Sequence, residues 1–165
     1  MTYVRTREGW LYLCVILDLF NRRIVGWQTS TRIDRKLVCD VFNYALACQG
    51  YPTNIMVHSL AKQCFSGSQY CSRDFRALLL KNDCNQSMSI SGNCWDNAVA
   101  ESFFSSLKKE QIKRRIYSSR DEARSDIFEY IEVFYNRRRR HSHLGQLSPA
   151  DYEEKANLNE INECL

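Results

Sequence analysis

The sequence predicts an α/β fold in which a mixed sheet carries helices on both faces. The chain has 165 residues, which is the size of one domain with a sizeable core. Three strand-like segments come first, and helical and strand-like patterns alternate after them. This order is typical of the α/β class. We expect one domain over residues 1–152 and a C-terminal tail over residues 153–165.

The three opening strands are expected to form an antiparallel meander. Residues 2–5 predict the first strand and Leu11–Phe20 the second. The second is almost continuously apolar, as in a strand that is covered on both faces. Asn21 and Arg22 then predict a turn, and Arg23–Thr29 returns as the third strand.

A helix and a short strand follow the meander. Segment Arg35–Cys48 has apolar residues at helical spacing, namely positions 37, 38, 41, 42, 45 and 46. Gly50 and Pro52 end this helix. Asn54–His58 is then predicted to be a short strand.

Two further helices and one strand are expected around the centre and the end of the chain. Asp74–Lys81 has helical spacing, and Met88–Ile90 is the last predicted strand. Asp121–Tyr135 predicts an amphipathic helix. Its inward residues are expected to be Ile127, Tyr130, Ile131 and Phe134.

The central helix carries the most informative pattern. Gly92 and Asn93 predict a turn, Asp96 or Asn97 the N-cap, and the residues from Ala98 onward contain nothing that breaks a helix. One broad apolar face is formed by Val99, Ala100, Phe103, Phe104 and Leu107. On the other side, Glu101 and Lys108 lie almost in line, so they could present a carboxylate and an ammonium group to a common cleft. The alternative is that both are ordinary solvated side chains.

Composition limits the class of protein. The net charge is +4, and many arginines gather in the last third of the chain, where their field could face a polyanion. Eight cysteines are present without a Cys-x-x-Cys pair, and the N-terminus does not have the pattern of a signal peptide, so we expect reduced thiols and a cytoplasmic protein. No apolar run is long enough to predict a membrane span.

A family resemblance adds to these observations. The run from Asp96 to Lys108 closely resembles the last catalytic segment of insertion-sequence transposases of the IS3 type, which are relatives of retroviral integrases. Further matches follow in the family's order at Trp10–Trp27, Val57–Ser59, Gly67–Ser72 and Tyr135–Pro149. Together they cover about residues 2–152, and several long collinear motifs are far more specific than one short pattern.

The resemblance implies a ribonuclease-H-like core that takes part in DNA transposition. Such cores bind transposon ends and target DNA, and we expect a homo-oligomer on DNA. They cut and rejoin DNA with two Mg²⁺ or Mn²⁺ ions held by two aspartates and one glutamate. On this resemblance, Glu101 is the glutamate, so it is the expected catalytic residue and metal ligand.

The two aspartates have no counterpart in this sequence. The first family aspartate precedes an Ile-Thr-Tyr-Val pattern, so it would fall just before Met1. The second follows Val-His-Ser, where this chain has Leu60, and counting back from Glu101 by the family's spacing gives Phe65. Asp18 is the best substitute, although the family does not assign this position to the metals. The resemblance therefore predicts a core that does not catalyse strand transfer.

Other residues have expected roles as well. By resemblance, Lys108 contacts DNA near the active site, and Arg137, Arg138, Arg139, Arg140 and His141 are candidates for contact with phosphates, against the alternative of a solvated charge run. Tyr3, Trp10 and Trp27 are expected in the core, against the alternative that they stack on bases, and His58 is expected to be structural. Two alternatives to the inactive transposase core stay open. One is a catalytically dead module that binds nucleic acid or interferes with an intact transposase, and the other is a gene remnant without function.

Overall fold

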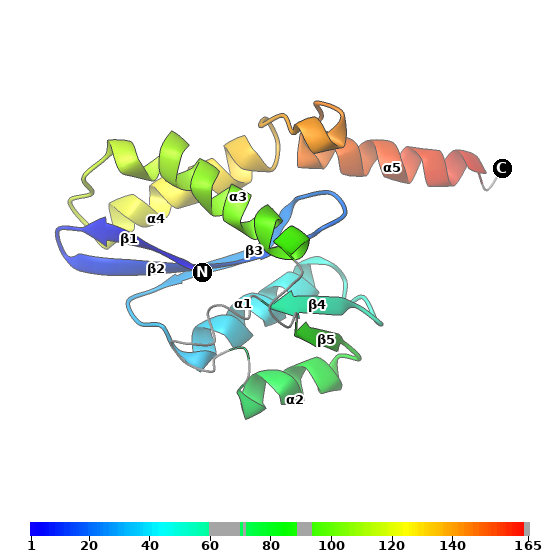
Figure 1. Ribbon diagram of the computed structural model, residues 1–165, viewed down its shortest axis with the longest axis horizontal. Helices are drawn as coiled ribbons and strands as arrows, with labels where there is room; N and C mark the ends of the chain where they lie inside the picture. Colours follow the sequence, from blue (N-terminus) through cyan, green and yellow to red (C-terminus); the bar gives the residue numbers. More distant parts are fainter. Residues whose placement is uncertain (60–69, 71, 89–93, 164–165) are drawn as a thin grey trace.

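An antiparallel sheet of three strands forms the first layer of the computed structural model, which describes residues 1–59, 70, 72–88 and 94–163 (Figure 1). The strands are β1 (Thr2–Thr6), β2 (Gly9–Leu17) and β3 (Ile24–Ser30), in the order β1-β2-β3. Each strand pairs with the next along the chain, and the β2–β3 register shifts between Ile16 and Leu17. The predicted meander is confirmed.

Helix α1 (Arg35–Cys48) covers one face of this sheet and has the predicted bounds. It begins at Asp34, whose side chain accepts a hydrogen bond from the backbone N–H of Leu37, as N-cap residues do. Gly26 of β3 allows the helix to approach the sheet closely. A Cβ atom at this position would lie 2.8 Å from Cβ of Ala45, which is closer than two carbon atoms can pack.

A second, parallel sheet is formed by β4 (Met56–Ser59) and β5 (Asn85–Met88), which are joined by α2 (Arg73–Lys81). The prediction of the last strand at Met88–Ile90 was wrong in position, because the strand begins at Asn85; positions 89 and 90 lie outside the described residues. The first three residues of β5 are polar, so the apolar pattern gave no signal for them. Backbone pairing holds the strand instead, including a 2.8 Å hydrogen bond from the N–H of Asn85 to the C=O of Ile55.

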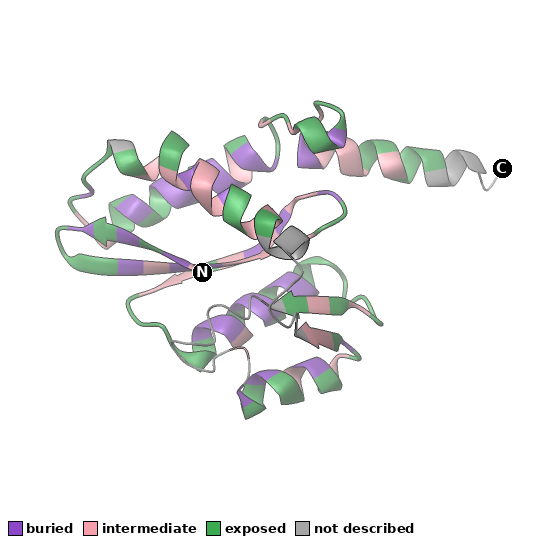
Figure 2. Cartoon of the chain, viewed as in Figure 1, coloured by how far each residue is buried: buried purple, intermediate pink, exposed green. Residues whose placement is uncertain are grey.

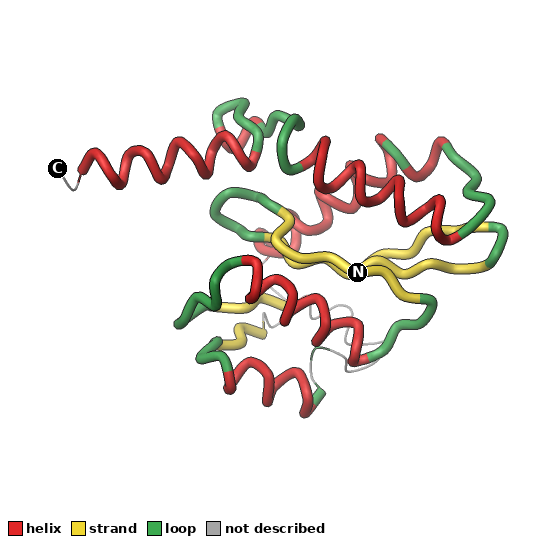
Figure 3. The backbone as a smooth tube through the Cα atoms, turned by 180° about the vertical axis from the view of Figure 1, so that it is seen from behind, coloured by secondary structure: helices red, strands yellow, loops and turns green. Residues whose placement is uncertain are grey.

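Helix α3 (Cys94–Glu110) lies on the opposite face of the β1–β3 sheet from α1 (Figures 1 and 3). The predicted N-cap was wrong, because Asp96 and Asn97 lie inside the first turn rather than before it. An acidic residue also suits the first turn of a helix, so the sequence signal does not distinguish the two positions. Phe103 and Leu107 are buried as predicted and form the main core with β1, β2 and the following helices.

The predicted helix Asp121–Tyr135 is one helical stretch with two geometries. It begins as α4 (Arg120–Phe128) and widens into the π-helix η3 (Glu129–Tyr135). Ile127, Tyr130 and Ile131 are buried as predicted, but Phe134 is 40% exposed and Tyr135, at 3%, takes the inward place. A π-helix has more residues per turn than an α-helix, so the buried face moves on by one residue.

The last elements extend away from the sheets. They are η4 (Ser142–Leu144) and α5 (Pro149–Glu163), whereas the short helix η2 (Ile112–Arg114) comes earlier, between α3 and α4. Helix α5 includes most of the expected tail and projects along the longest axis of the molecule (Figures 1 and 3). Figure 2 shows that exposed residues predominate along it, whereas buried residues gather in α1 and α4. None of the helices among the described residues has the length and apolar character of a membrane span.

The fold class is confirmed, because strands of both orientations lie between helices on either side. Within the described residues, the backbone ladders form two separate sheets rather than one continuous sheet. A second core lies between α1 and α2, where Phe42 and Phe75 meet edge to face at 5.5 Å. Among the described residues, packed side chains rather than backbone hydrogen bonds therefore connect the two sheets. The candidate site lies in this region.

Candidate functional site

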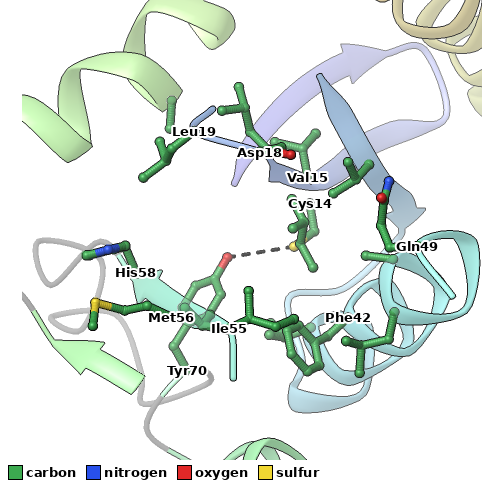
Figure 4. A pocket seen from close by; sticks show the side chains of 18 of the residues that line it. Cys14, Val15, Asp18, Leu19, Phe42, Gln49, Ile55, Met56, His58 and Tyr70 are labelled. Atoms are coloured by element: carbon green, nitrogen blue, oxygen red, sulfur yellow. Dashed lines mark hydrogen bonds between the residues drawn. The ribbon is translucent and has the colours of Figure 1, made fainter. Parts of the chain in front are cut away.

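A cavity of about 640 Å³ lies between β2, α1, β4 and α3 (Figure 4). Its walls are mainly apolar, and Ala100 and Phe104 of α3 contribute to them. Asp18 from the end of β2 and His58 from β4 lie on different sides of it, and Tyr70 points into it. A cavity of this size and lining, with a few polar groups, is typical of a binding site.

Cys14 and Tyr70 form a contact inside this cavity, with 3.7 Å between the sulfur and the phenol oxygen. Burial raises the pKa of the Cys14 thiol, and burial also raises the pKa of Tyr70 well above its ordinary value. Both groups are therefore neutral at physiological pH. Because the thiolate is the reactive form of cysteine, Cys14 is not suited to act as a nucleophile.

Asp18 is held by the turn that follows β2. Its Oδ1 accepts a 2.8 Å hydrogen bond from the backbone N–H of Phe20, and its own N–H donates to the C=O of Arg23 at 2.9 Å. These bonds give Asp18 a role in the turn between β2 and β3, where Arg22 has a positive φ of 62°. One oxygen of the carboxylate thus has a structural partner, although the residue lies at the cavity.

Glu101 lies beside the cavity wall on α3 and is exposed. Its neighbour Ala100 lines the cavity, whereas Glu101 itself is not among the lining residues. Within the described part of the chain, no three His, Cys, Asp or Glu side chains gather as a metal site would require. Leu60 and Phe65, at the positions where the family's second aspartate is expected, lie outside the described residues, and neither side chain can bind a metal. Among the side chains that the structure describes, the donors therefore do not fit a centre for two divalent ions.

Lys108 lies two turns after Glu101 on the same helix. Its Nζ is 5.1 Å from the centre of the Tyr3 ring, which is a cation–π distance. This contact holds the ammonium group against Tyr3, an exposed residue of β1. The sequence placed Glu101 and Lys108 in line along the helix, and the structure adds Tyr3 as the partner of the lysine.

The arginine run does not behave as one unit. Arg137, Arg138 and Arg140 are exposed, but Arg139 folds back onto α3. Its guanidinium donates to both carboxylate oxygens of Glu110 at 3.0–3.3 Å and to the hydroxyl of Ser106 at 3.1 Å. Three arginines are therefore available to a phosphate, and the fourth already has anionic and polar partners.

Glu110 also accepts a 2.7 Å hydrogen bond from the hydroxyl of Tyr130. Burial by itself would raise the pKa of Glu110, but the hydrogen bonds from Arg139 and Tyr130 outweigh it and lower the pKa. Burial and the bond to Glu110 raise the pKa of Tyr130 far above its ordinary value. This network was not found from the sequence, because Glu110 and Arg139 are 29 residues apart and share no motif.

His141 packs edge to face on Tyr135, with ring centres 4.9 Å apart. Its Nε2 is buried and, among the described residues, has no hydrogen-bond partner. Burial, together with the charges of Arg139 and Arg22, lowers the pKa of His141 to about 4. At neutral pH the ring is therefore uncharged, so it does not offer a cation to a phosphate.

The expectation that Tyr3 and Trp10 are core residues was wrong. Tyr3 is 55% exposed and Trp10 is 45% exposed. Strand alternation places Val4 and Leu11 on the covered face and these two rings on the opposite face, where α1 packs mainly on β3 and the adjoining half of β2. Trp27 is partly buried, and its Nε1 donates to Glu132 at 2.9 Å.

A family model described as "Integrase core domain" matches residues 1–94, and a second model with the same description matches residues 101–156. The chain belongs to the integrase core domain family. Within this family it is similar to transposases of the IS3 type.

Two curated relatives are similar in sequence. The chain is 46% identical over 155 residues to "Transposase InsF for insertion sequence IS3A" of Escherichia coli (strain K12), covering 94% of this chain and 52% of the relative. It is 44% identical to "Insertion element IS600 uncharacterized 31 kDa protein" of Shigella sonnei, with 94% and 55% covered. The chain thus spans about half the length of these relatives.

Two solved structures share the fold. The chain superposes on a simian T-cell lymphotropic virus intasome, solved in complex with PP2A regulatory subunit B56 gamma, with a TM-score of 0.66, 16% identity, and 90% and 50% of the two chains covered. It also superposes on the HTLV-2 integrase catalytic core domain in complex with magnesium, in its dimeric form, with a TM-score of 0.53, 11% identity, and 90% and 87% covered. At these identities the likeness concerns the fold, and it confirms the predicted ribonuclease-H-like class.

Proposed function

We propose that this chain is an integrase-like core of DNA transposition that binds DNA but does not, as it stands, catalyse metal-dependent strand transfer. The observation that carries the proposal is the isolation of Glu101. It is exposed on α3, and within the described residues no cluster of further ligands accompanies it. The family's second aspartate is replaced in the sequence by Leu60 or Phe65.

The chemistry explains why one carboxylate is not enough. In the family reaction, a pair of Mg²⁺ or Mn²⁺ ions activates the attacking oxygen and stabilises the leaving oxygen. Several converging carboxylates are needed to hold such ions beside a polyanionic backbone. Asp18 does not restore the set by itself, because it gives one oxygen to the turn after β2. A single exposed glutamate is therefore expected to bind divalent ions weakly.

DNA binding is supported by the distribution of positive charge. Arg137, Arg138 and Arg140 are exposed on one short segment, and Lys108 lies on the helix that carries Glu101. Guanidinium groups pair well with phosphate oxygens, and this part of the interaction does not depend on base sequence. We infer that these four side chains hold the backbone of transposon-end or target DNA.

Assembly with a second copy is the remaining part of the proposal. The relatives of known structure include an intasome and a dimer of a catalytic core. A core that keeps the shared fold but lacks catalysis could join an intact transposase in a mixed assembly and reduce its activity. This interfering role belongs to a different class from catalysis, and the similarity to the IS3 transposase makes it testable in a mixture with that relative.

A cleavage assay tests the proposal directly. A labelled duplex that carries the end sequence of IS3, the insertion sequence of the similar transposase, is incubated with the chain and Mg²⁺ or Mn²⁺. Glu101→Gln is the matched control. We expect both proteins to retain the duplex in a binding assay and to leave product at the background level. Cleavage by the unmodified chain above that of Glu101→Gln would overturn the inactive assignment, and failure of both proteins to bind DNA at low salt would overturn the DNA-binding assignment.

A further inference from the structure

The outward face of the β1–β2 hairpin carries an unusual combination of side chains. Tyr3 pairs with Tyr12 and Arg5 with Trp10 in the antiparallel register. Because side chains alternate along a strand, these four residues share the face opposite to the main core. We call Tyr3, Arg5, Trp10 and Tyr12, together with Lys108, the hairpin platform.

Two aromatic rings of the platform are open to solvent. The Tyr3 and Trp10 rings meet edge to face, with centres 5.1 Å apart and planes at 85°. This geometry fixes the rings against each other while each is about half exposed. Adjacent exposed rings of this size are more often part of a binding surface than isolated exposed side chains are.

The charges around the rings favour an anionic occupant. Arg5 is exposed beside Trp10, and Nζ of Lys108 lies 5.1 Å from the centre of the Tyr3 ring. Glu8, the acidic residue of the hairpin turn, is already engaged, because its carboxylate accepts from the backbone N–H of Arg120 at 2.8 Å. The immediate surroundings of the rings are therefore cationic, which disfavours a purely apolar partner.

The position of the platform links it to the candidate site. Lys108 is seven residues after Glu101 on α3, which corresponds to a rise of about 10 Å along a helix. A strand of DNA that contacts Lys108 could therefore reach Glu101 within a few nucleotides. Exposed aromatic rings beside cationic side chains are the features with which proteins hold single strands, since bases stack on the rings and phosphates pair with the cations.

We infer that the hairpin platform stacks the unpaired bases of a DNA strand beside helix α3, which carries Glu101. This inference rests on the proposed function, because it names the form of DNA that one surface of the core takes. The exposed Arg137, Arg138 and Arg140 contribute contacts to the DNA backbone, whereas the platform distinguishes single strands from duplex. Stacking on an aromatic ring does not distinguish one base from another. The platform is therefore expected to prefer single-stranded DNA over duplex, without a preference for base sequence.

The test compares a fluorescent single-stranded oligothymidylate with a duplex of the same length. We expect Trp10→Ala to weaken single-strand binding about 10-fold and the pair Tyr3→Ala with Trp10→Ala up to about 100-fold, while duplex binding changes less than about twofold. Trp10→Phe keeps a stacking ring and should retain most of the affinity. Tyr44→Ala is the matched control, because Tyr44 is equally exposed but lies on α1.

The salt dependence separates stacking from charge. Trp10→Ala should leave the slope of log affinity against log salt unchanged, because no phosphate contact is lost, whereas Arg5→Ala should lower it. Far-UV circular dichroism and sedimentation are recorded for each variant.

Unchanged single-strand binding by both aromatic variants would overturn the inference and leave the proposed function intact. A shift in self-association without a change in DNA binding would assign the platform to a second copy instead, and absence of DNA binding by the unmodified chain would overturn both proposals.

Discussion

Arg139 and Glu110 join the segment after η3 to the end of α3, with Nη2 of the arginine 3.0 Å from Oε1 of the glutamate and Nε 3.2 Å from Oε2. The fork of two hydrogen bonds fixes the direction in which the chain leaves the π-helix. The neighbouring arginines are thereby turned to solvent. Arg139 thus holds residues 137–140 against α3, while the other three arginines of this segment stay exposed.

Replacing Arg139 should affect stability more than DNA binding. Arg139→Ala removes the ion pair and leaves Glu110 with Tyr130 as its remaining hydrogen-bonding partner among those described. We expect a loss of about 1–2 kcal/mol in the free energy of unfolding, allowing for the partial exposure of both side chains. Urea denaturation measures it. The exposed Arg138→Ala serves as control and should change stability by less than about 0.5 kcal/mol.

DNA binding should depend on the exposed arginines. A variant with Arg137, Arg138 and Arg140 all changed to alanine is expected to bind duplex at least about 10-fold more weakly at physiological salt, and its salt slope should fall by about 1 to 3. Fluorescence anisotropy at several salt concentrations measures both quantities. Arg76→Ala, an exposed arginine of α2 far from this segment in Figure 1, is the matched control. Equal losses in both proteins would contradict a localised contact.

Stability should fall in mild acid because of His141. Its pKa is lowered from 6.5 to about 4 in the folded protein, so between these values the unfolded chain binds a proton that the folded chain does not. The free energy of unfolding therefore decreases as pH falls from about 6.5 to about 4.

His141→Phe keeps a ring against Tyr135 and removes the titration. We expect the stability difference between pH 7 and pH 5 to shrink by about 1 kcal/mol in this variant, after allowance for the partial exposure of the ring. Urea unfolding at the two pH values measures the difference. A variant at position 141 that keeps the full pH dependence would show that other groups produce it.

The π-helix predicts an unusual order of sensitivity at two adjacent aromatic residues. Tyr135→Ala should cost about 3–5 kcal/mol, because the buried ring packs on Phe103 at 4.9 Å between ring centres. Phe134→Ala should cost less than about 1 kcal/mol, because Phe134 is the exposed member of the pair. Thermal and urea unfolding measure both variants. The reverse order would mean that the helix continues with ordinary α geometry.

Cooperative unfolding distinguishes a stable module from a gene remnant. The main core runs without interruption from Val4 and Leu11 through Phe103 to Ile127 and Tyr135. We therefore expect a single sharp transition, with coincident curves by near-UV and far-UV circular dichroism. A broad transition, or curves that do not coincide, would favour the remnant.

The sequence was sufficient where local chemistry marks an element. Helix α1 was predicted with its bounds, because its apolar spacing is regular and Gly50 follows its end. The paired strands of the meander were predicted for similar reasons, since the apolar runs are long and a turn separates them. Glu101 and Lys108 were correctly placed on one helix by their spacing.

Other features depend on contacts that a linear pattern does not contain. The polar start of β5 is held by pairing with β4, and the shift from Phe134 to Tyr135 follows from a change of helix type. The exposure of Trp10 depends on how far α1 extends over the sheet. Arg139 looked the same as its neighbours in sequence, and Glu110, its partner, is 29 residues away.

The absence of a side chain at Gly26 has a consequence for the cavity, although this residue does not line it. The close contact with Ala45 sets the gap between α1 and the sheet, and both Val25 and Ala45 belong to the cavity walls. A methyl group at position 26 would act as a wedge that pushes the helix outward and widens the chamber. The width of the cavity is thus set in part by Gly26, a residue that does not line it.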